Sequence, residues 1–317
     1  MNASSRHPPD ARWPELPYEP WKRTAATLQL WTQIVGKIRA TLTPWTNHSW
    51  HVTLYVSDRG LTTGPIVHGE RTFSIEFDLI GRRLVVSTCD GERALVPLEP
   101  QTTADFYRRT MRALHDLQLT VAIHRYPNEV PEPRRFDLDR EHASYDAEAA
   151  ERFWRVLLQV DRVFRVFRAG FIGKVSPVHF FWGSFDLAVT RFSGREAPEH
   201  PGGIPNLPDW VTREAYSHEV SSAGFWPGAD ALPQPIFYSY AYPAPDGFAG
   251  ARVLPDAASW NAELGEFVLA YDAVRRSSSP DRTLLDFLRT TYEAAADLGR
   301  WDRAALERTF DLPRRRA

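Results

Sequence analysis

The stretch 173–191, GKVSPVHFFWGSFDLAVTR, sets a histidine, a lysine, an aspartate and an arginine in an otherwise apolar and aromatic run. Its two halves, separated at Gly183-Ser184, predict paired strands over 177–192. Burying such polar groups costs several kcal/mol unless hydrogen-bond or charge partners satisfy them. We therefore expect this hairpin to line a pocket, and the candidate site starts from it.

Strand alternation divides the second strand of this hairpin between two faces. Asp186, Ala188 and Thr190 are expected on one face, and Leu187, Val189 and Arg191 on the other. In the first strand, His179 shares a face with Phe181. An imidazole beside a carboxylate suits a general base and equally half of a metal site, so His179 and Asp186 are candidate catalytic residues. The alternative is a buried His–Asp pair that only stiffens the hairpin.

Two further catalytic candidates lie outside the hairpin. The segment 47–51, NHSWH, contains His48 and His51 at a predicted strand entrance. Both could reach one metal if the segment curls before the strand, whereas an extended backbone directs them to opposite faces. His51 is then the pocket candidate and His48 a turn residue, and a hydrogen-bonded core histidine is the alternative for His51. Tyr145, in HASYD at the start of a predicted helix, could face the same cleft.

The segment 213–228, REAYSHEVSSAGFWPG, follows a long glycine- and proline-rich loop and is predicted to be a lid. Its His218, together with His179 and Asp186, would form a two-histidine, one-carboxylate set for a divalent metal, and Glu219 could replace Asp186. No HExxH-type signature accompanies these residues. A divalent metal is one candidate cofactor, and the sequence identifies none.

Other residues near the hairpin are candidates for direct ligand contact. Lys174 and Arg191 could pair with Asp186 or anchor an anionic group of a ligand. Trp182 and Trp226 could form an aromatic wall, because tryptophans beside polar residues suit a surface where a ring meets a ligand. The expected partner is therefore a small molecule.

Around these motifs the sequence predicts an α+β fold of two similar halves, each a helix, an antiparallel sheet and a helix. The expected divisions are an extended arm at 1–18, a first half at 19–126, a proline-rich connector at 127–146, a second half with the candidate site at 147–300 and a tail at 301–317. Helices are expected at 21–42, 102–117, 148–170 and 280–299, and strands at 50–56, 72–79, 83–89, 94–98, 119–124, 177–192, 237–242 and 266–272. A pseudo-twofold duplication is one interpretation of this repeat, and coincidence between two α+β units is the other.

The composition of the chain excludes several classes of partner. The 317 residues carry a formal net charge of -2, which argues against a nucleic-acid or membrane-surface binder. The single cysteine, Cys89, excludes an intrachain disulfide and fits the cytoplasm. No window approaches the roughly 18 apolar residues of a membrane span, and the N-terminus lacks an apolar signal stretch. We expect a soluble protein of unknown oligomeric state.

Seven motifs together carry a family resemblance: LWTQIVGKIR, NHSWHVTLYVSDRGLTTGPI, HASYD, SPVHFFWGSFDLAVTRFSGR, REAYSHEVSSAGFWPG, FYSYAYP and LGEF. With these motifs the chain closely resembles a bacterial family known as domain-of-unknown-function family 5996. The resemblance runs from Trp13 to Arg308 and implies a bacterial protein with one family-wide architecture. It implies no activity, cofactor or catalytic residue.

Three classes of function fit these patterns. The favoured hypothesis is an enzyme that acts on a small molecule at a His/Asp/aromatic pocket, of hydrolase or non-haem oxygenase type, with a bound metal as an option. The second is a non-catalytic module whose aromatic pocket holds an apolar or aromatic ligand. The third is an interaction scaffold that meets a partner protein through a Trp-rich loop.

Overall fold

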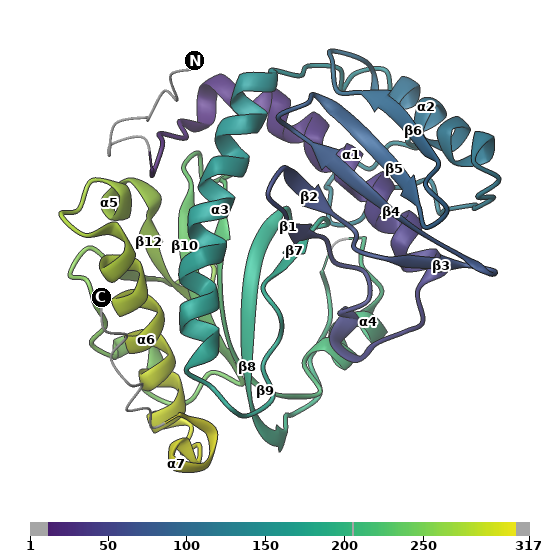
Figure 1. Cartoon of the computed structure of the whole chain (residues 1–317). Helices are drawn as coiled ribbons and strands as arrows, with labels where there is room; N and C mark the ends of the chain where they lie inside the picture. The colour runs from purple at the N-terminus through teal and green to yellow at the C-terminus, as the bar shows by residue number, and fades with distance from the viewer. Residues whose placement is uncertain (1–11, 205, 309–317) are drawn as a thin grey trace, which may run out of the picture.

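Two antiparallel sheets of six strands each organise the chain (Figure 1). The structure is a computed structural model that describes residues 12–204 and 206–308. The first sheet contains β1 (Tyr55–Val56), β2 (Gly60–Thr62), β3 (Ile66–His68), β4 (Arg71–Asp78), β5 (Arg83–Thr88) and β6 (Arg93–Pro97), in the order β1-β2-β4-β5-β6 with β3 paired to β4. The second contains β7 (His179–Phe181), β8 (Asp186–Glu196), β9 (His218–Trp226), β10 (Ile236–Tyr242), β11 (Ser259–Asn261) and β12 (Glu266–Ala270), in the order β11-β12-β10-β9-β8-β7.

Seven α-helices accompany these sheets in the described ranges. They are α1 (Tyr18–Leu42), α2 (Thr103–Asp116), α3 (Ala147–Ala169), α4 (Asp209–Ala215), α5 (Tyr271–Arg275), α6 (Pro280–Leu298) and α7 (Arg303–Leu306). The four long helices begin and end close to the predicted bounds, because their signals are local. The Asp146 side chain, for example, accepts hydrogen bonds from the first backbone N–H groups of α3. The predicted α+β fold is confirmed.

Three predictions about secondary structure were wrong. Residues 119–124 form no strand, since the chain turns at Gln118 (φ 61°) and continues as a loop. The predicted strand 50–56 is reduced to β1, because His48 and Ser49 both adopt a left-handed backbone with φ 58° and form a turn before it. The predicted lid 213–228 is instead mostly β9, a central strand hydrogen-bonded to β8 and β10.

The predicted terminal segments are described only in part. Residues 1–11 of the arm and 309–317 of the tail lie outside the described residues. Within the described part of the arm, Trp13 and Leu16 are buried against the body of the protein. The Trp13 indole N–H donates to Asp281 Oδ1 at 3.2 Å, which fastens the arm to the start of α6.

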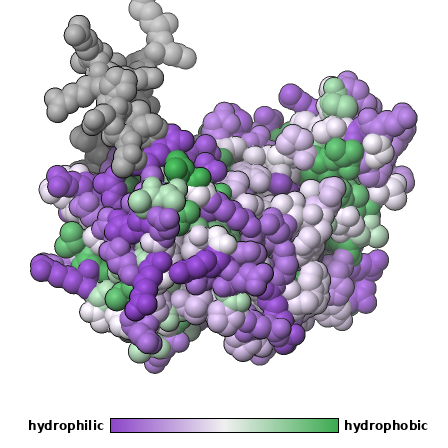
Figure 2. All heavy atoms as spheres, turned by 90° about the horizontal axis from the view of Figure 1, so that it is seen from below, coloured by the Kyte–Doolittle hydropathy of each residue, from purple (hydrophilic) through white to green (hydrophobic). Residues whose placement is uncertain are grey.

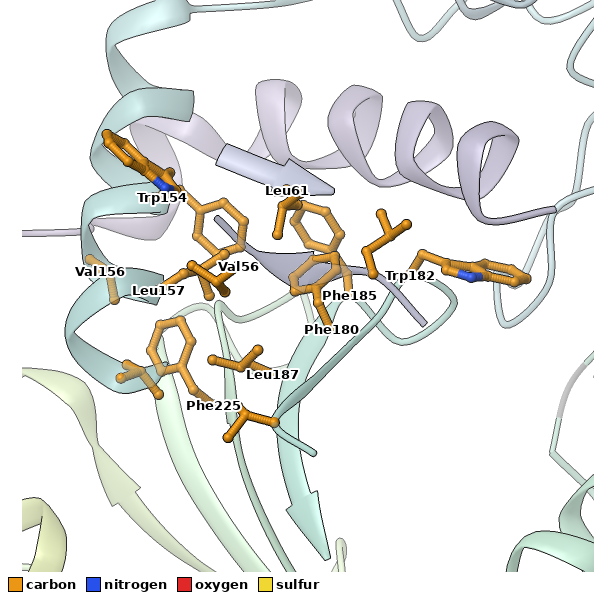
Figure 3. Packing of buried hydrophobic residues seen from close by; sticks show 14 of the residues in the cluster. Val56, Leu61, Trp154, Val156, Leu157, Phe180, Trp182, Phe185, Leu187 and Phe225 are labelled. Carbon is orange, nitrogen blue, oxygen red and sulfur yellow. The ribbon is translucent and has the colours of Figure 1, made fainter. Parts of the chain in front are cut away.

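One hydrophobic core connects the two sheets. Leu54 and Phe180 exchange two backbone hydrogen bonds of 2.9 and 2.8 Å, which joins the segment before β1 to β7. Figure 3 shows the Phe180 and Phe185 rings between residues of the first sheet, such as Leu61, and residues of the second sheet, such as Leu187. The two predicted halves therefore share their packing, while a duplication origin stays a prediction.

The second sheet has one apolar and one polar face. Helices α3 and α6 pack on the apolar face, where Leu187, Val189 and Phe225 are buried (Figure 1). The opposite face carries the even-numbered residues of β8, and four of them, Asp186, Ala188, Thr190 and Phe192, line a cavity.

No helix in the described ranges is both long and apolar enough to cross a bilayer. The face seen in Figure 2 is mainly hydrophilic, with separate small hydrophobic patches.

Candidate functional site

A cavity of about 680 Å³ lies on the polar face of the second sheet, away from α3 and α6. Cavities of this volume are typical of small-molecule sites. The strands of the floor contribute Asp186, Ala188, Thr190, Phe192, Val220, Ser222, Trp226, Ile236, Tyr238, Tyr240 and Glu266. Antiparallel pairing sets these residues side by side, so that Tyr240, Ser222 and Thr190 form one row across the sheet.

Distant segments of the chain complete the walls. They contribute Lys37, Ala40 and Thr41 from α1, Trp45, His48, Ser49, Trp50 and Val52 from the turn before β1, His124, Asn128 and Glu129 from the connector region, Phe181, Trp182, Gly183 and Ser184 from the hairpin, and Ile204, Trp210 and Tyr216 from the segment around α4. Both predicted halves thus enclose the cavity, which lies at their junction.

Asp186 lies at the centre of a hydrogen-bond network on the floor. Ser184 Oγ donates to Asp186 Oδ1, and the Tyr238 hydroxyl donates to Asp186 Oδ2. Burial raises the pKa of Asp186, and these two hydrogen bonds oppose that shift because they stabilise the carboxylate. Both oxygens are therefore held in a fixed orientation.

Gly224 is what allows Tyr238 to reach Asp186. Gly224 is paired with Tyr238 across β9 and β10, and the tyrosine ring lies over the glycine backbone. A Cβ atom at position 224 would overlap the Tyr238 ring. Any larger residue would have to displace the ring and with it the hydrogen bond to Asp186.

Glu129 and Glu266 are the other two carboxyl groups of the cavity. Burial, reinforced by the negative charge of Asp186 and opposed by Lys37, raises the pKa of Glu129 to about 7. Burial and the Asp186 charge likewise raise the pKa of Glu266 to about 7. Among the described residues, neither carboxylate has a hydrogen-bond donor or an ion-pair partner. Both are thus partly buried acceptors for which the described residues supply no hydrogen-bond donor.

The loop that carries Glu129 is fastened to α1. Gln33 Nε2 donates to the Asn128 carbonyl at 2.9 Å, and the Asn128 N–H donates to Gln33 Oε1 at 2.8 Å. Glu129 itself has a left-handed backbone with φ 57°, and its carboxylate packs against Gly183, where a Cβ would overlap it. These contacts position the Glu129 carboxylate beside the hairpin.

Lys37 is the one lysine or arginine among the described lining residues. Its ammonium donates to Asn128 Oδ1 and lies 5.5 Å from the centre of the Trp182 ring. Burial lowers the pKa of Lys37 to about 8, and the charge of Glu129 opposes the shift. The cavity therefore contains three carboxyl groups and a single amine.

Three of the predicted site residues line the cavity: Asp186, Trp182 and Trp226. Trp182 is held by its indole N–H, which donates to the Val52 carbonyl at 2.7 Å. Their role in binding or catalysis stays a prediction.

The three other predicted catalytic residues do not line the cavity. His179 is buried with its ring edge to Trp50, at 5.8 Å between centroids, and burial together with the charges of Arg39 and Arg168 lowers its pKa to about 3. His51 packs on Trp45, and its Nδ1 accepts the Thr46 N–H at 3.3 Å. Tyr145 stacks on Trp31 in the core, with ring centroids 5.1 Å apart.

The two predicted anion anchors also lie elsewhere. Arg191 points to the apolar face, where its guanidinium lies 3.5 Å from the centre of the Phe167 ring and 4.2 Å from that of Tyr292. Successive residues of β8 point to opposite faces, so Arg191 lies on the face opposite to Asp186, Ala188 and Thr190. Lys174 contacts His48 Nε2 and lies 4.8 Å from the centre of the Phe192 ring, outside the cavity lining.

The predicted metal ligands are not gathered by the fold. Glu219 forms an ion pair of 2.6 Å with Arg195, and His218 Nδ1 lies 3.1 Å from Ser217 Oγ. Across residues 12–204 and 206–308, no group of three or more His, Cys, Asp or Glu side chains is arranged to hold a metal ion. The set of His179, His218, Asp186 and Glu219 is therefore not assembled.

His48 lines the cavity in place of the expected His51. The left-handed turn at His48 and Ser49 reverses the expected faces. His48 Nδ1 lies 3.0 Å from the Ala215 carbonyl, so it donates there and leaves Nε2 to accept from Lys174. Burial and the charge of Lys174 lower the pKa of His48, so the ring is neutral at neutral pH.

The fold and the cavity define an α+β protein with a half-open pocket of small-molecule size that contains three carboxyl groups from the described residues. A family model described as a family of unknown function, DUF5996, matches residues 13–308. The chain belongs to this family, and the resemblance seen in its motifs is confirmed. No curated protein and no solved structure matches the chain.

The raised pKa values predict how stability depends on pH. Because the folded-state pKa of Glu129 and Glu266 is about 7, above the ordinary value of 4.5, folding favours their protonated forms. Their contribution to stability is full below pH 4.5 and is lost as the pH rises through 7. Urea unfolding across this range should show wild-type stability falling more steeply with pH than that of Glu129→Gln.

A matched control lies on the same loop. Glu132 is exposed and does not line the cavity, so Glu132→Gln should keep the wild-type pH slope. A Glu129→Gln slope identical to that of wild type would contradict the enclosure of Glu129.

Proposed function

We propose that the protein is an enzyme that acts on a small molecule held in this cavity, with carboxyl groups carrying out the proton transfers. The observation that supports it is that Asp186, Glu129 and Glu266 line one cavity, with Lys37 as the single lysine among its described lining residues. Carboxyl groups tuned towards neutral pH and gathered in a cleft are typical of general acid–base catalysis.

The carboxyl groups divide into two kinds. Asp186 already accepts two hydrogen bonds and is suited to orient a bound molecule or to stabilise positive charge on it. Glu129 and Glu266 have free acceptor oxygens and a pKa of about 7 each, so acid and base forms coexist at neutral pH. One group can accept a proton while another donates one, which is the requirement of acid–base hydrolysis.

The environment of the cavity supports the same proposal. Trp182, Trp226 and Trp50 give it apolar walls, and charge interactions are stronger beside such walls than in open water. We also propose that the protein works in the cytoplasm, because its one cysteine has no partner for an intrachain disulfide.

The test is a turnover screen on a mixture of small metabolites, read by mass spectrometry. We expect wild type and Glu132→Gln to consume the same compound, and Asp186→Asn to consume it at least about 100-fold more slowly. Equal consumption by Asp186→Asn would contradict the proposal. So would compounds that bind to wild type without being consumed, the outcome expected of a binding module, and so would neither binding nor consumption.

A further inference from the structure

We infer that the cavity selects an organic cation, a compact apolar or aromatic body that carries a primary or secondary ammonium group. The inference rests on the proposed function of the same cavity and names its substrate class. Three independent features support it: the balance of charged groups, the unused acceptor oxygens and the arrangement of the tryptophans.

The balance of charged groups is acidic. Asp186, Glu129 and Glu266 line the cavity, and among the described lining residues Lys37 is the single lysine or arginine to balance them. Enclosed carboxylates are stable only when a cation or hydrogen-bond donors accompany them. A bound ammonium group would supply the missing positive charge, whereas an anionic ligand would add a fourth negative group.

The unused acceptors match the donors of an ammonium group. Within the described residues, Ser184 and Tyr238 already donate to Asp186, but no side chain or backbone group donates to Glu129 or Glu266. A primary ammonium has three donors, and hydrogen bonds in which both partners are charged are the stronger kind. The carboxylate oxygens of Glu129 and Glu266 are thus free to accept hydrogen bonds from an ammonium group with several N–H donors.

The tryptophans supply both an apolar wall and a surface for positive charge. Trp182 already carries the Lys37 ammonium at 5.5 Å from its ring centre, which shows that this wall accommodates a cation. Trp45 and Trp210 are 49% and 57% exposed and lie 5.0 Å apart between ring centroids. Both line the cavity, and such an exposed aromatic pair is suited to contact the apolar body of an entering ligand.

A neutral polyol is the strongest competing ligand, because sugars also bind to carboxylates and tryptophans. A polyol donates hydrogen bonds but leaves the excess negative charge in place. Matched pairs that differ only in an amine or an alcohol therefore separate the two ligand classes.

The experiment is isothermal titration calorimetry with a panel of aromatic and alicyclic primary amines, among them 2-phenylethylamine and cyclohexylmethylamine. Each amine is paired with its alcohol, and methyl glucoside represents the polyols. We expect at least one amine to bind at least about tenfold more tightly than its alcohol, which corresponds to about 1.4 kcal/mol. Titration at pH 7 in two buffers of different ionisation enthalpy should also show protons released on binding, because the cation favours ionised Glu129 and Glu266.

The variants identify the groups responsible. Glu129→Gln and Glu266→Gln should each weaken amine binding at least about tenfold and leave alcohol binding unchanged, whereas Glu132→Gln should bind like wild type. Thermal unfolding of each variant checks that it is folded. No amine binding more tightly than its alcohol, or methyl glucoside binding more tightly than every amine, would overturn the inference.

Different results would contradict the ligand class inferred here and the enzymatic function proposed above. Amines that bind through Glu129 and Glu266 but are never consumed would leave the ligand class standing and refute the enzyme. If a neutral compound is consumed with dependence on Asp186 and no amine binds, the enzymatic function is supported and the ligand class is refuted.

Discussion

Glu129→Gln is expected to slow turnover of the substrate found by the screen by about 100- to 10,000-fold. The amide has nearly the same shape as the carboxylate, so contacts with Gly183 and the fastening of the loop to α1 are kept. What is lost is the ability to accept a proton near neutral pH, where the pKa of Glu129 is about 7. The measurement is kcat and KM for wild type and variant, with KM changing less than kcat.

The pH profile adds a second readout to this prediction. As the base form of Glu129 disappears below its pKa of about 7, wild-type kcat/KM should fall when the medium is acidified through that value. The residual kcat/KM of Glu129→Gln should not fall in this way when the medium is acidified. Turnover within about threefold of wild type would rule out Glu129 as a proton-transferring group.

Phe180→Ala is expected to reduce the free energy of unfolding by about 3–5 kcal/mol. Phe180 is fully buried, and its ring lies 5.3 Å from that of Phe185 and 6.3 Å from that of Phe153 between centroids. Its backbone also pairs with Leu54, so the ring fills the junction of the two sheets. Urea unfolding followed by tryptophan fluorescence and circular dichroism measures the loss.

The same experiment tests whether the two sheets form one unit. Both probes should report a single transition in wild type, because the core is continuous across the junction. Leu95→Ala, an exposed position on β6, should change stability by no more than about 0.5 kcal/mol. Separate transitions for the two halves, or a loss below about 1 kcal/mol in Phe180→Ala, would contradict the shared core.

Much of the fold could be predicted because its signals are local. The apolar spacing and end signals of α1, α2, α3 and α6 lie within each helix. Period-two alternation in β8 correctly separated Asp186 from Arg191, and the prediction of Arg191 as a ligand contact conflicted with that alternation. In β8, strand alternation was therefore a more reliable guide to which residues face the cavity than the chemistry of the Arg191 side chain.

The candidate site was harder to predict because long-range packing assembles it. Glu129 lies in a proline-rich connector, and nothing local distinguishes it from the exposed Glu132 three residues later. Its enclosure depends on contacts with α1 and with Gly183. Lys37 and Glu266 are likewise ordinary residues of a helix and a strand until the sheet pairing and the connector bring them together.

Local backbone conformation explains why His48, and not the predicted His51, lines the cavity. The prediction for His48 and His51 assumed an extended chain, but two consecutive left-handed residues precede β1. The sequence analysis did assign His48 to a turn, and histidine is one of the residue types enriched in left-handed backbone, but the continuation of that conformation at Ser49 carried no sequence signal. The FYSYAY alternation of β10 did contain a usable signal, since Tyr238 and Tyr240 share the cavity face, and it identifies a polar floor.

The most direct test of the central claim is a carboxyl titration by NMR, with ¹³C-labelled glutamate, in wild type and Asp186→Asn. In wild type, Glu129 and Glu266 should titrate near pH 7, far above the ordinary 4.5. Because the charge of Asp186 contributes to both shifts, its removal should lower both pKa values together. Ordinary pKa values in wild type, or values that Asp186→Asn leaves unmoved, would show that the three carboxyl groups do not share one cavity.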